Sequence, residues 1–318
     1  MELIRDLHNL RERHRGCVLT VGNFDGVHLG HQAIVEQLVS RAREAGVPAL
    51  LMTFEPQPQE FFAGARVRAR LTRLREKVHA LARLPLDRIL VVRFDRAFSN
   101  LTPDAFIEDL LVRRLGIREI VVGDDFRFGR GGQGDFAQLV AAGERLSFDV
   151  VRRDTVRRDG RRVSSSWVRE LLTEGRLAQA AALLGRPYSM LGRVAQGDRL
   201  GRSIGFPTAN IPLHRRISPV SGVFAVRVAG LAPQPLPGMA NVGMRPTVSG
   251  TERRLEVHLF GFDRDVYGRH VEVEFLHKLR DEVRFGSLDA LRVQLERDAA
   301  KAKEMLSRDD ESMALDKR

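Results

Sequence analysis

The pattern of apolar residues changes once along this chain of 318 residues, near Gly185-Arg186-Pro187. Before that point, short apolar runs alternate with helical spacings, which is typical of a parallel sheet whose strands are joined by helices. After it, frequent glycines separate stretches of alternating apolar and polar residues, which indicates an antiparallel barrel or sandwich. Single hydrophobic cores stop growing near roughly 250–300 residues. The sequence therefore predicts two domains, residues 1–186 and 187–310, and a charged tail over residues 311–318.

In the first domain, each predicted strand is followed by a loop or by the start of a helix. The expected strands are Val18–Val21, Ala49–Phe54, Ile89–Val92, Ile120–Val122 and Phe148–Val151. The expected helices are one that ends at Gly46, one with Leu71, Leu74, Val78 and Leu81 on a single face, and one capped by Thr102-Pro103. Open α/β sheets bind ligands beyond the ends of their strands, so we expect the ligand site at this edge.

The second domain is predicted to be built of strands and one closing helix. The expected strands are Val223–Val228, Leu255–Phe260 and Val271–Phe275, and the helix covers roughly Leu288 to Leu306. The last dozen residues are charged, and we expect them to fray.

Composition narrows the class of protein. Lys and Arg number 52 against 41 Asp and Glu, which gives a net charge of +11. The basic residues are spread along the chain, and Trp and Tyr are too few for a base-stacking surface, so nucleic acid is not the expected partner. No apolar run is long enough to span a membrane, and no export signal is evident at the N-terminus. Cys17 is the only cysteine, which excludes an intramolecular disulfide, fits a cytoplasmic protein and is expected to be a packed thiol.

The first of three motifs follows the first predicted strand and reads Gly22-Asn23-Phe24-Asp25-Gly26-Val27-His28-Leu29-Gly30-His31. Its glycines let the backbone approach a phosphate, and the next helix directs its positive N-terminus at the same point. His28 and His31 are positioned to donate hydrogen bonds to charge on an α-phosphate and on leaving pyrophosphate. A metal pair is one alternative, but no carboxylate or third histidine stands at the spacing of a zinc site, and ordinary surface histidines are the other. We therefore predict that this motif binds a nucleotide.

The second motif is Val163-Ser164-Ser165-Ser166-Trp167-Val168-Arg169. Hydroxyls at the start of a helix can cap it and hold phosphate oxygens, and Arg169 adds a cation one turn later. A serine triplet alone more often serves only as a cap.

The third motif runs from Gly197 to Asn210 and places Gly197, Gly201 and Gly205 four residues apart. Backbone amides of such a loop can form an anion-binding nest. Thr208 and Asn210 stand two residues apart on an extended segment, where both can reach Mg²⁺ and phosphate. From composition alone, glycine-rich turns between strands are the simpler interpretation.

Together these motifs resemble known families. The first two resemble the signatures of the nucleotidyltransferase superfamily, with Val163 in place of Ile and Ser166 in place of Thr. The whole set resembles the bacterial bifunctional riboflavin kinase/FAD synthetases over about residues 15–300. The further segments that carry this resemblance are Thr53–Pro58, Val122–Asp135, Asn241–Thr247, Leu255–Leu259 and Arg280–Phe285. Gly261 departs from the family pattern, in which Asp often follows Leu-Phe.

The resemblance implies a Rossmann-like nucleotidyltransferase domain and a C-terminal antiparallel β-barrel riboflavin kinase domain with a terminal helix. Riboflavin would be phosphorylated to FMN by ATP, and FMN would then be adenylylated by ATP to give FAD and pyrophosphate. Both steps would require Mg²⁺ and would take place in the cytoplasm.

The resemblance also implies roles for single residues. The implied catalytic residues are His28, His31 and Glu256, where Glu256 activates the riboflavin 5′-hydroxyl. The alternation of Glu256 with Leu255 and Val257 also permits an exposed strand residue without that role. The implied ATP-binding residues of the first domain are Gly22, Asn23, Phe24, Asp25, Gly30, Ser164, Ser165, Ser166 and Arg169. Those of the kinase are Gly197, Gly201, Gly205, Thr208 and Asn210, with Thr208 and Asn210 also binding the metal. The implied flavin-binding residues are Asp125, Phe128, Arg280 and Glu282, although packing of Phe128 in the core is equally compatible with the sequence.

Two other hypotheses stay open at this point. Only one of the two domains could be active, or the chain could be a basic nucleic-acid-binding protein on an inherited scaffold. The oligomeric state is not predicted.

Overall fold

The computed structural model describes residues 1–64, 68–196, 204–247 and 250–315. The chain divides into two compact units, Met1–Arg68 with Thr72–Ser164, and Ala69–Leu71 with Ser165–Arg318. The second unit thus includes helices α7 (Ser165–Thr173) and α8 (Leu177–Leu184), and α8 packs against two strands of that unit.

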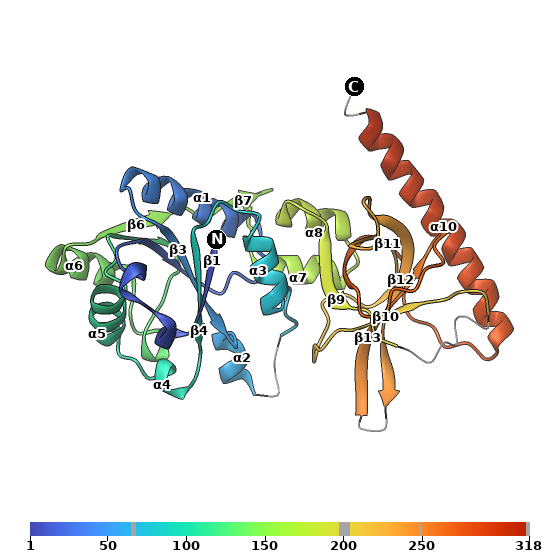
Figure 1. The fold of residues 1–318 in the computed structure, drawn as a ribbon, viewed down its shortest axis with the longest axis horizontal. Helices are drawn as coiled ribbons and strands as arrows, with labels where there is room; N and C mark the ends of the chain where they lie inside the picture. Colours follow the sequence, from blue (N-terminus) through green and yellow to red (C-terminus); the bar gives the residue numbers. More distant parts are fainter. Residues whose placement is uncertain (65–67, 197–203, 248–249, 316–318) are drawn as a thin grey trace. The chain divides into compact units, whose positions relative to one another are not determined.

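The first unit is built on a parallel sheet, as the sequence predicts (Figure 1). Among the described residues it has six strands in the order β1-β4-β3-β2-β5-β6. They are β1 (Glu2–Arg5), β2 (Val18–Val21), β3 (Ala49–Glu55), β4 (Arg88–Arg93), β5 (Glu119–Gly123) and β6 (Asp149–Arg153). A small antiparallel hairpin of β7 (Arg157–Arg158) and β8 (Arg161–Arg162) follows β6.

Helical segments connect these strands. They are α1 (Leu29–Glu44), α2 (Pro58–Ala63), α3 (Leu74–Leu81), α4 (Arg96–Ser99), α5 (Pro103–Ala105), the π-helix η3 (Phe106–Arg114) and α6 (Phe136–Leu146). Short 3-10 turns are η1 (Leu7–Asn9), η2 (Glu12–His14) and η4 (Arg130–Gly132). The Thr102 side chain caps α5 by accepting from the Ala105 amide, as its sequence position predicts.

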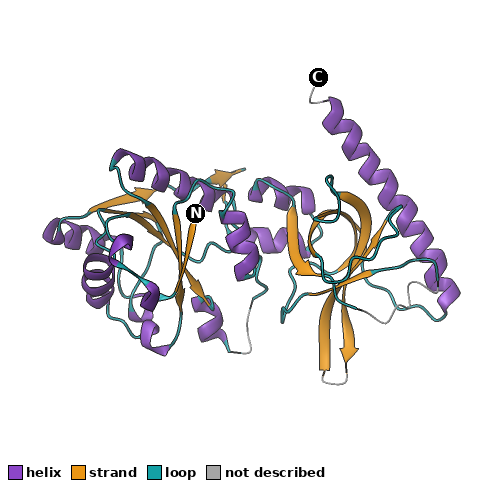
Figure 2. Cartoon of the chain, viewed as in Figure 1, coloured by secondary structure: helices purple, strands orange, loops and turns teal. Residues whose placement is uncertain are grey.

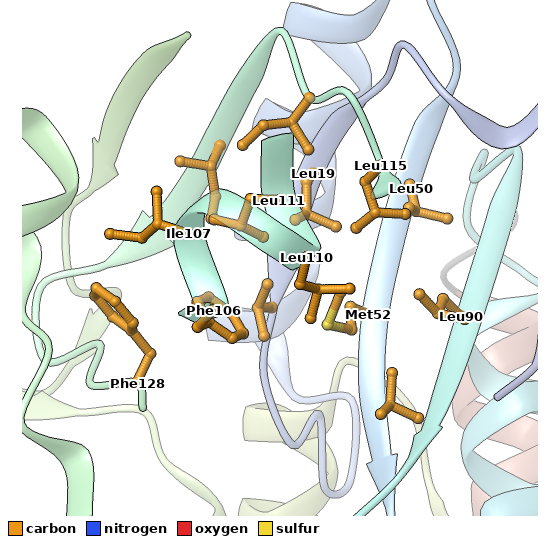
Figure 3. Close-up of a cluster of buried hydrophobic side chains, with 14 of the residues drawn as sticks. Leu19, Leu50, Met52, Leu90, Phe106, Ile107, Leu110, Leu111, Leu115 and Phe128 are labelled. Atoms are coloured by element: carbon orange, nitrogen blue, oxygen red, sulfur yellow. The ribbon is translucent and has the colours of Figure 1, made fainter. Parts of the chain in front are cut away.

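Each face of the parallel sheet buries its own hydrophobic core, because side chains of a strand alternate between the faces. Leu19 and Met52 pack on one face with η3 and α6, whereas Val18 and Leu51 pack on the other with α1 and α3. Figure 3 shows the first of these cores around η3. Cys17 is fully buried in it, and this burial raises the pKa of the thiol to about 12, so the expectation of a packed thiol is confirmed.

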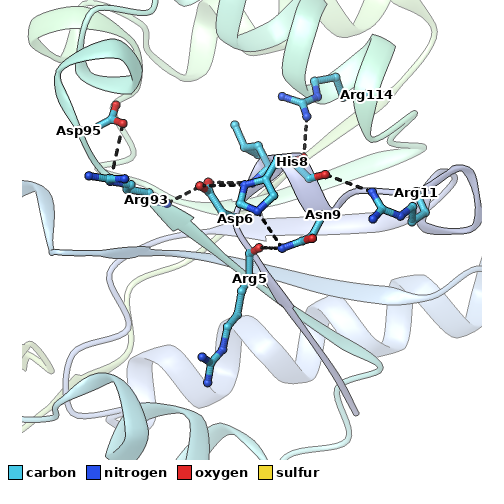
Figure 4. A network of polar contacts seen from close by, with 9 residues as sticks. Arg5, Asp6, His8, Asn9, Arg11, Arg93, Asp95 and Arg114 are labelled. Atoms are coloured by element: carbon cyan, nitrogen blue, oxygen red, sulfur yellow. Dashed lines mark hydrogen bonds and ion pairs between the residues drawn. The ribbon is translucent and has the colours of Figure 1, made fainter.

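Strand β1 was not expected from the sequence, because its four residues show no apolar run. It pairs in parallel with β4 at the sheet edge. Polar contacts beyond its end hold it there, as Figure 4 shows: the Asp6 carboxylate accepts from the Arg93 amide, and the Arg114 guanidinium donates to the Leu7 carbonyl.

The second unit contains an antiparallel sheet in the order β10-β13-β12-β11-β14-β9 (Figure 2). Its strands are β9 (Tyr188–Arg193), β10 (Ala209–Pro212), β11 (Gly222–Ala229), β12 (Leu236–Thr247), β13 (Gly250–Leu259) and β14 (His270–Arg280). The Ala195 amide donates to the Asn210 carbonyl at 2.8 Å, which joins the two ends of the sheet. The strands therefore form a nearly closed barrel, and the predicted α/β-plus-barrel fold class is confirmed.

Helix α10 (Leu288–Leu315) packs on the outside of this barrel through Ala299, Ala302 and Leu306. The expectation that the helix ends near Leu306 and that the tail frays is wrong for residues up to Leu315. The reason lies in contacts with the barrel, since Arg227 pairs with Asp310 and His277 lies 2.8 Å from Asp309.

Candidate functional sites

The turn after β2 carries the first motif and is held in an unusual conformation. Phe24, Gly26 and Val27 all have positive φ angles, of 48°, 85° and 47°. This region is costly for a β-branched residue such as Val27, and strain of this kind concentrates at functional sites. The turn is fixed by Asp25, whose buried carboxylate accepts from both the amide and the hydroxyl of Thr72.

His28 and His31 lie together at the start of α1. Their rings stack at 3.7 Å between centroids and 15° between planes, and His28 caps the helix. A Cβ on Gly30 would come within 3.2 Å of the His28 ring, so a side chain there would crowd that ring, and it would be in ordinary contact with the Val163 carbonyl at 3.4 Å. The histidine pair is thus at the positive end of a helix, as the motif predicts.

The surroundings of His31 are positively charged. Burial lowers the pKa of His31 well below its ordinary value of 6.5, and the charges of His28, Lys77 and Arg162 lower it further. Its Nδ1 atom is buried and has no hydrogen-bond partner within the described part of the chain. A polyanion bound at this point would meet several cations and a neutral imidazole with an N–H to donate.

Two of these cations, Lys77 and Arg162, were not among the predicted site residues. Lys77 is fully buried, and its ammonium donates to the Thr53 hydroxyl at 3.1 Å. Its place three residues after Leu74 and four before Leu81, on the apolar face of α3, was a signal in the sequence. Arg162 follows other arginines of the β7–β8 hairpin, directly before the second motif.

The second motif spans the border between the two units. Val163 and Ser164 belong to the first unit, whereas Ser165, Ser166 and Arg169 belong to the second. Helix α7 begins at Ser165, as the triplet predicts, and Arg169 donates through Nε to the Ala69 carbonyl at 2.6 Å. Phosphate binding by these residues stays a prediction.

The two flavin-binding candidates of the first unit have different environments. Asp125 is exposed, and its carboxylate lies 2.8 Å from the Arg162 guanidinium, which raises the pKa of Arg162. Phe128 is only 5% exposed and belongs to the core beside Phe106 (Figure 3). Phe128 therefore packs in the core, which was one of the two interpretations of the sequence, and its contact with flavin stays a prediction.

In the second unit, strand pairing brings the kinase candidates into one row. Asn210 of β10 pairs with Glu256 of β13, which pairs in turn with Asn241 of β12. The row continues through Val223 of β11 to Arg280 of β14. Paired residues on neighbouring strands have Cβ atoms about 4.5–5.5 Å apart. The proposed metal ligand and the proposed base are thus direct neighbours, although 46 positions separate them in the sequence.

The described end of the third motif is anchored to β13. His258 donates through Nδ1 to the Pro207 carbonyl at 2.9 Å, and its ring meets that of Phe206 edge-on. Glu256 and His258 share one face of β13, as predicted, while Leu255, Val257 and Leu259 are buried on the other. Gly205 has a φ of 84°, which suits glycine at a turn. Gly197 and Gly201 lie outside the described residues.

Thr208 lines a cavity of about 250 Å³. Pro207 and Val257 lie on its wall, together with Asp265 and Tyr267 from the loop between β13 and β14. The cavity therefore joins the third motif to a loop that contains both carboxylate and aromatic groups.

Asn241 is a further polar residue of the row. Its segment is part of the family resemblance, but no role was predicted for the residue itself. Its Oδ1 is buried without a hydrogen-bond partner in the described ranges. Two positions on, Gly243 leaves space for Glu282, whose Oε1 lies 2.0 Å from where a Cβ would stand. The predicted Glu282 is thereby placed near the row.

Arg280 is tied to the terminal helix. Its Nε donates to the buried Asp298 of α10 at 2.9 Å, and Gln294 donates to the other oxygen of the same carboxylate. The ion pair with Asp298 thus fixes the Arg280 side chain, and the contact of Arg280 with flavin stays a prediction.

Comparison with known proteins agrees with this geometry. A family model for FAD synthetase matches residues 10–167, and one for riboflavin kinase matches residues 184–306. The bifunctional riboflavin kinase/FMN adenylyltransferase of Escherichia coli K12 is 52% identical over 96% of this chain and 97% of its own length. This chain belongs to the bifunctional riboflavin kinase/FMN adenylyltransferase family. The resemblance stated from the motifs is confirmed.

Other relatives of the family match as fully. Bifunctional riboflavin kinase/FMN adenylyltransferases of Haemophilus influenzae and Pseudomonas fluorescens are 48% and 47% identical over 95% of this chain, and 98% and 97% of their own lengths. A crystal structure described as a macrolide-efflux protein from Streptococcus pneumoniae has a TM-score of 0.80 at 29% identity, and the match covers 94% of this chain and 97% of that one. In this chain, no helix within the described residues is long and apolar enough to cross a membrane.

Proposed function

We propose that this chain carries out two successive ATP-dependent reactions, one in each unit. The barrel unit phosphorylates riboflavin to FMN, and the parallel-sheet unit transfers AMP from a second ATP to FMN, giving FAD and pyrophosphate. The observation that carries the proposal is that two separate polar clusters, one in each unit, combine with family matches for both activities.

In the kinase reaction, Glu256 would take the proton of the riboflavin 5′-hydroxyl. The freed oxygen attacks the γ-phosphorus of ATP, the bond to the bridging oxygen breaks, and ADP leaves. The register supports this role because it sets Glu256 between Asn210 and Asn241. We propose that the cavity beside Thr208 takes the nucleotide and that Arg280 and Glu282 approach the flavin.

The donors at Thr208 and Asn210 fit Mg²⁺. A hydroxyl, an amide oxygen and a nearby carboxylate are hard oxygen ligands, and Mg²⁺ commonly binds one or two protein groups together with water and substrate phosphates. When bound, the ion would neutralise charge on the phosphates. The Asn210 side-chain amide donates weakly, at 3.4 Å, to the Thr208 carbonyl, which leaves its oxygen to face a ligand.

In the adenylyl transfer, a phosphate oxygen of FMN attacks the α-phosphorus of ATP and pyrophosphate leaves. His28 and His31 would donate hydrogen bonds to the charge that develops, while Lys77 and Arg162 add positive potential. The amides of the turn Gly22–Gly30 would hold the triphosphate. Phosphate binding by Ser164, Ser165, Ser166 and Arg169 is a further part of this proposal. No covalent intermediate is needed, because positioning and charge stabilisation suffice.

We further propose that the substrates are small molecules only and that the reactions occur in the cytoplasm, where ATP is available. The single cysteine and the dispersed basic residues support this setting.

Product analysis tests the proposal. The purified chain is incubated with riboflavin, ATP and Mg²⁺, and the flavins are separated by chromatography. We expect FMN first and FAD later, and His28→Ala is expected to stop at FMN. Production of FMN without any FAD by the wild-type chain would remove the adenylyltransferase assignment, and absence of both would remove the whole proposal.

A further inference from the structure

Three residues of the N-terminal half of the chain belong to the second unit. Ala69, Arg70 and Leu71 are grouped with residues 165–318, although the residues on either side are grouped with the first unit. Sequence reasoning assigned Leu71 only to the apolar face of a helix, whereas α3 begins at Leu74.

Side chains of the second unit hold the carbonyl groups of this segment. Arg215 donates through one nitrogen to the carbonyls of Arg70 at 3.0 Å and Leu71 at 3.4 Å. The Tyr188 hydroxyl donates to the Leu71 carbonyl at 3.0 Å and is itself 3.3 Å from Arg215. The bond between Tyr188 and Leu71 is buried, so water does not compete for it, while the Arg215 bonds are partly buried.

The next residue, Thr72, is fixed by the first unit. Its amide and hydroxyl donate to the Asp25 carboxylate at 2.9 and 3.1 Å, and its hydroxyl accepts from the Gly26 amide at 3.0 Å. Asp25 and Gly26 lie in the turn of the first motif, where Phe24, Gly26 and Val27 have positive φ angles. The Leu71 carbonyl, which the second unit holds, and the Thr72 amide, which binds Asp25, therefore belong to the same peptide group.

We propose that Arg215 and Tyr188 are positioning residues for the adenylyl transfer. By fixing the carbonyls of Arg70 and Leu71, they limit the backbone freedom of Thr72, and Thr72 binds Asp25 and Gly26 inside the turn that is strained at Phe24 and Val27. A strained turn keeps its geometry only when its surroundings determine it fully. This inference rests on the proposed function of the first unit and extends it by giving the kinase unit a part in the second reaction.

The test uses the full chain with Arg215→Ala and Tyr188→Phe, assaying riboflavin phosphorylation and FMN adenylylation separately. We expect the adenylylation kcat to fall on the order of 10–100-fold, since small misplacements of a site have effects of this size, while kinase kinetics stay at wild-type values. Arg215→Lys, which keeps a cationic donor, should recover part of the loss. Arg227→Ala is the matched control, because Arg227 also donates to a carbonyl, that of Leu306, and pairs with Asp310 of α10.

A structural readout separates this inference from the function it rests on. Amide hydrogen exchange over residues 22–31 should quicken in Arg215→Ala, and Thr72→Ala should give a similar change that is not additive with it. Unchanged exchange over residues 22–31 would overturn the inference whatever the activity, and so would an equal fall of both activities. A wild-type chain that makes no FAD would instead overturn the proposed function.

Discussion

At the scale of single residues, Glu256 is the group on which the kinase proposal depends most. It stands in the cross-strand row between Asn210 and Asn241. Glu256→Gln keeps the size of the side chain and removes the base, so we expect kinase kcat to fall on the order of 10²–10⁴-fold. Adenylylation of supplied FMN should be unaffected, and the exposed Glu296→Gln serves as the control. An unchanged kinase rate in Glu256→Gln would exclude Glu256 as the base.

His31 gives a prediction about pH and stability. Because burial lowers its pKa in the folded chain, the unfolded chain binds its proton first as the pH falls below about 6.5. The free energy of unfolding should therefore decrease below that pH, and His31→Gln should weaken this decrease. Urea unfolding at pH 7.5 and 5.5 measures it, with the exposed His79→Gln as the control. If the free energy of unfolding depends on pH equally in wild type and His31→Gln, the pKa of His31 is not lowered in the folded chain.

At the scale of elements, the link between β13 and the third motif should decide how the kinase binds ATP. His258→Ala removes the hydrogen bond to Pro207 and the ring contact with Phe206. A lost hydrogen bond of about 1 kcal/mol corresponds to roughly a fivefold rise in the kinase KM for ATP. His258→Asn, whose amide can donate from the place of Nδ1, should restore most of the affinity. A KM unchanged in His258→Ala would show that the loop is held by other contacts.

Elements also show where sequence reasoning succeeds and where it stops. The strands around Leu19, Leu51 and Val226 were predictable because apolar runs and alternation reflect burial directly. The four-residue β1 was missed because it is held by pairing with β4 and by polar contacts at Asp6. The extra turns of α10 were missed because their partners Arg227 and His277 lie on other elements.

At the scale of the whole molecule, the candidate sites also contain some residues with a local sequence signal and others that only tertiary contacts bring in. The motifs containing His28 and Glu256 were recognisable from residue type and spacing. Arg162 and Asn241 join those sites through tertiary contacts that no local pattern records, whereas Lys77 had a local signal in its place on the apolar face of α3. The grouping of residues 69–71 with the second unit also depends on tertiary contacts and was not predictable from the local sequence.

The central claim is that one chain holds two separate ATP sites, one for each reaction. Isothermal titration with α,β-methylene-ATP and Mg²⁺, without flavin, counts the sites directly. We predict two nucleotides bound per wild-type chain and one when His28 and His31 are both replaced by Ala. A stoichiometry of one in the wild-type chain would contradict the claim.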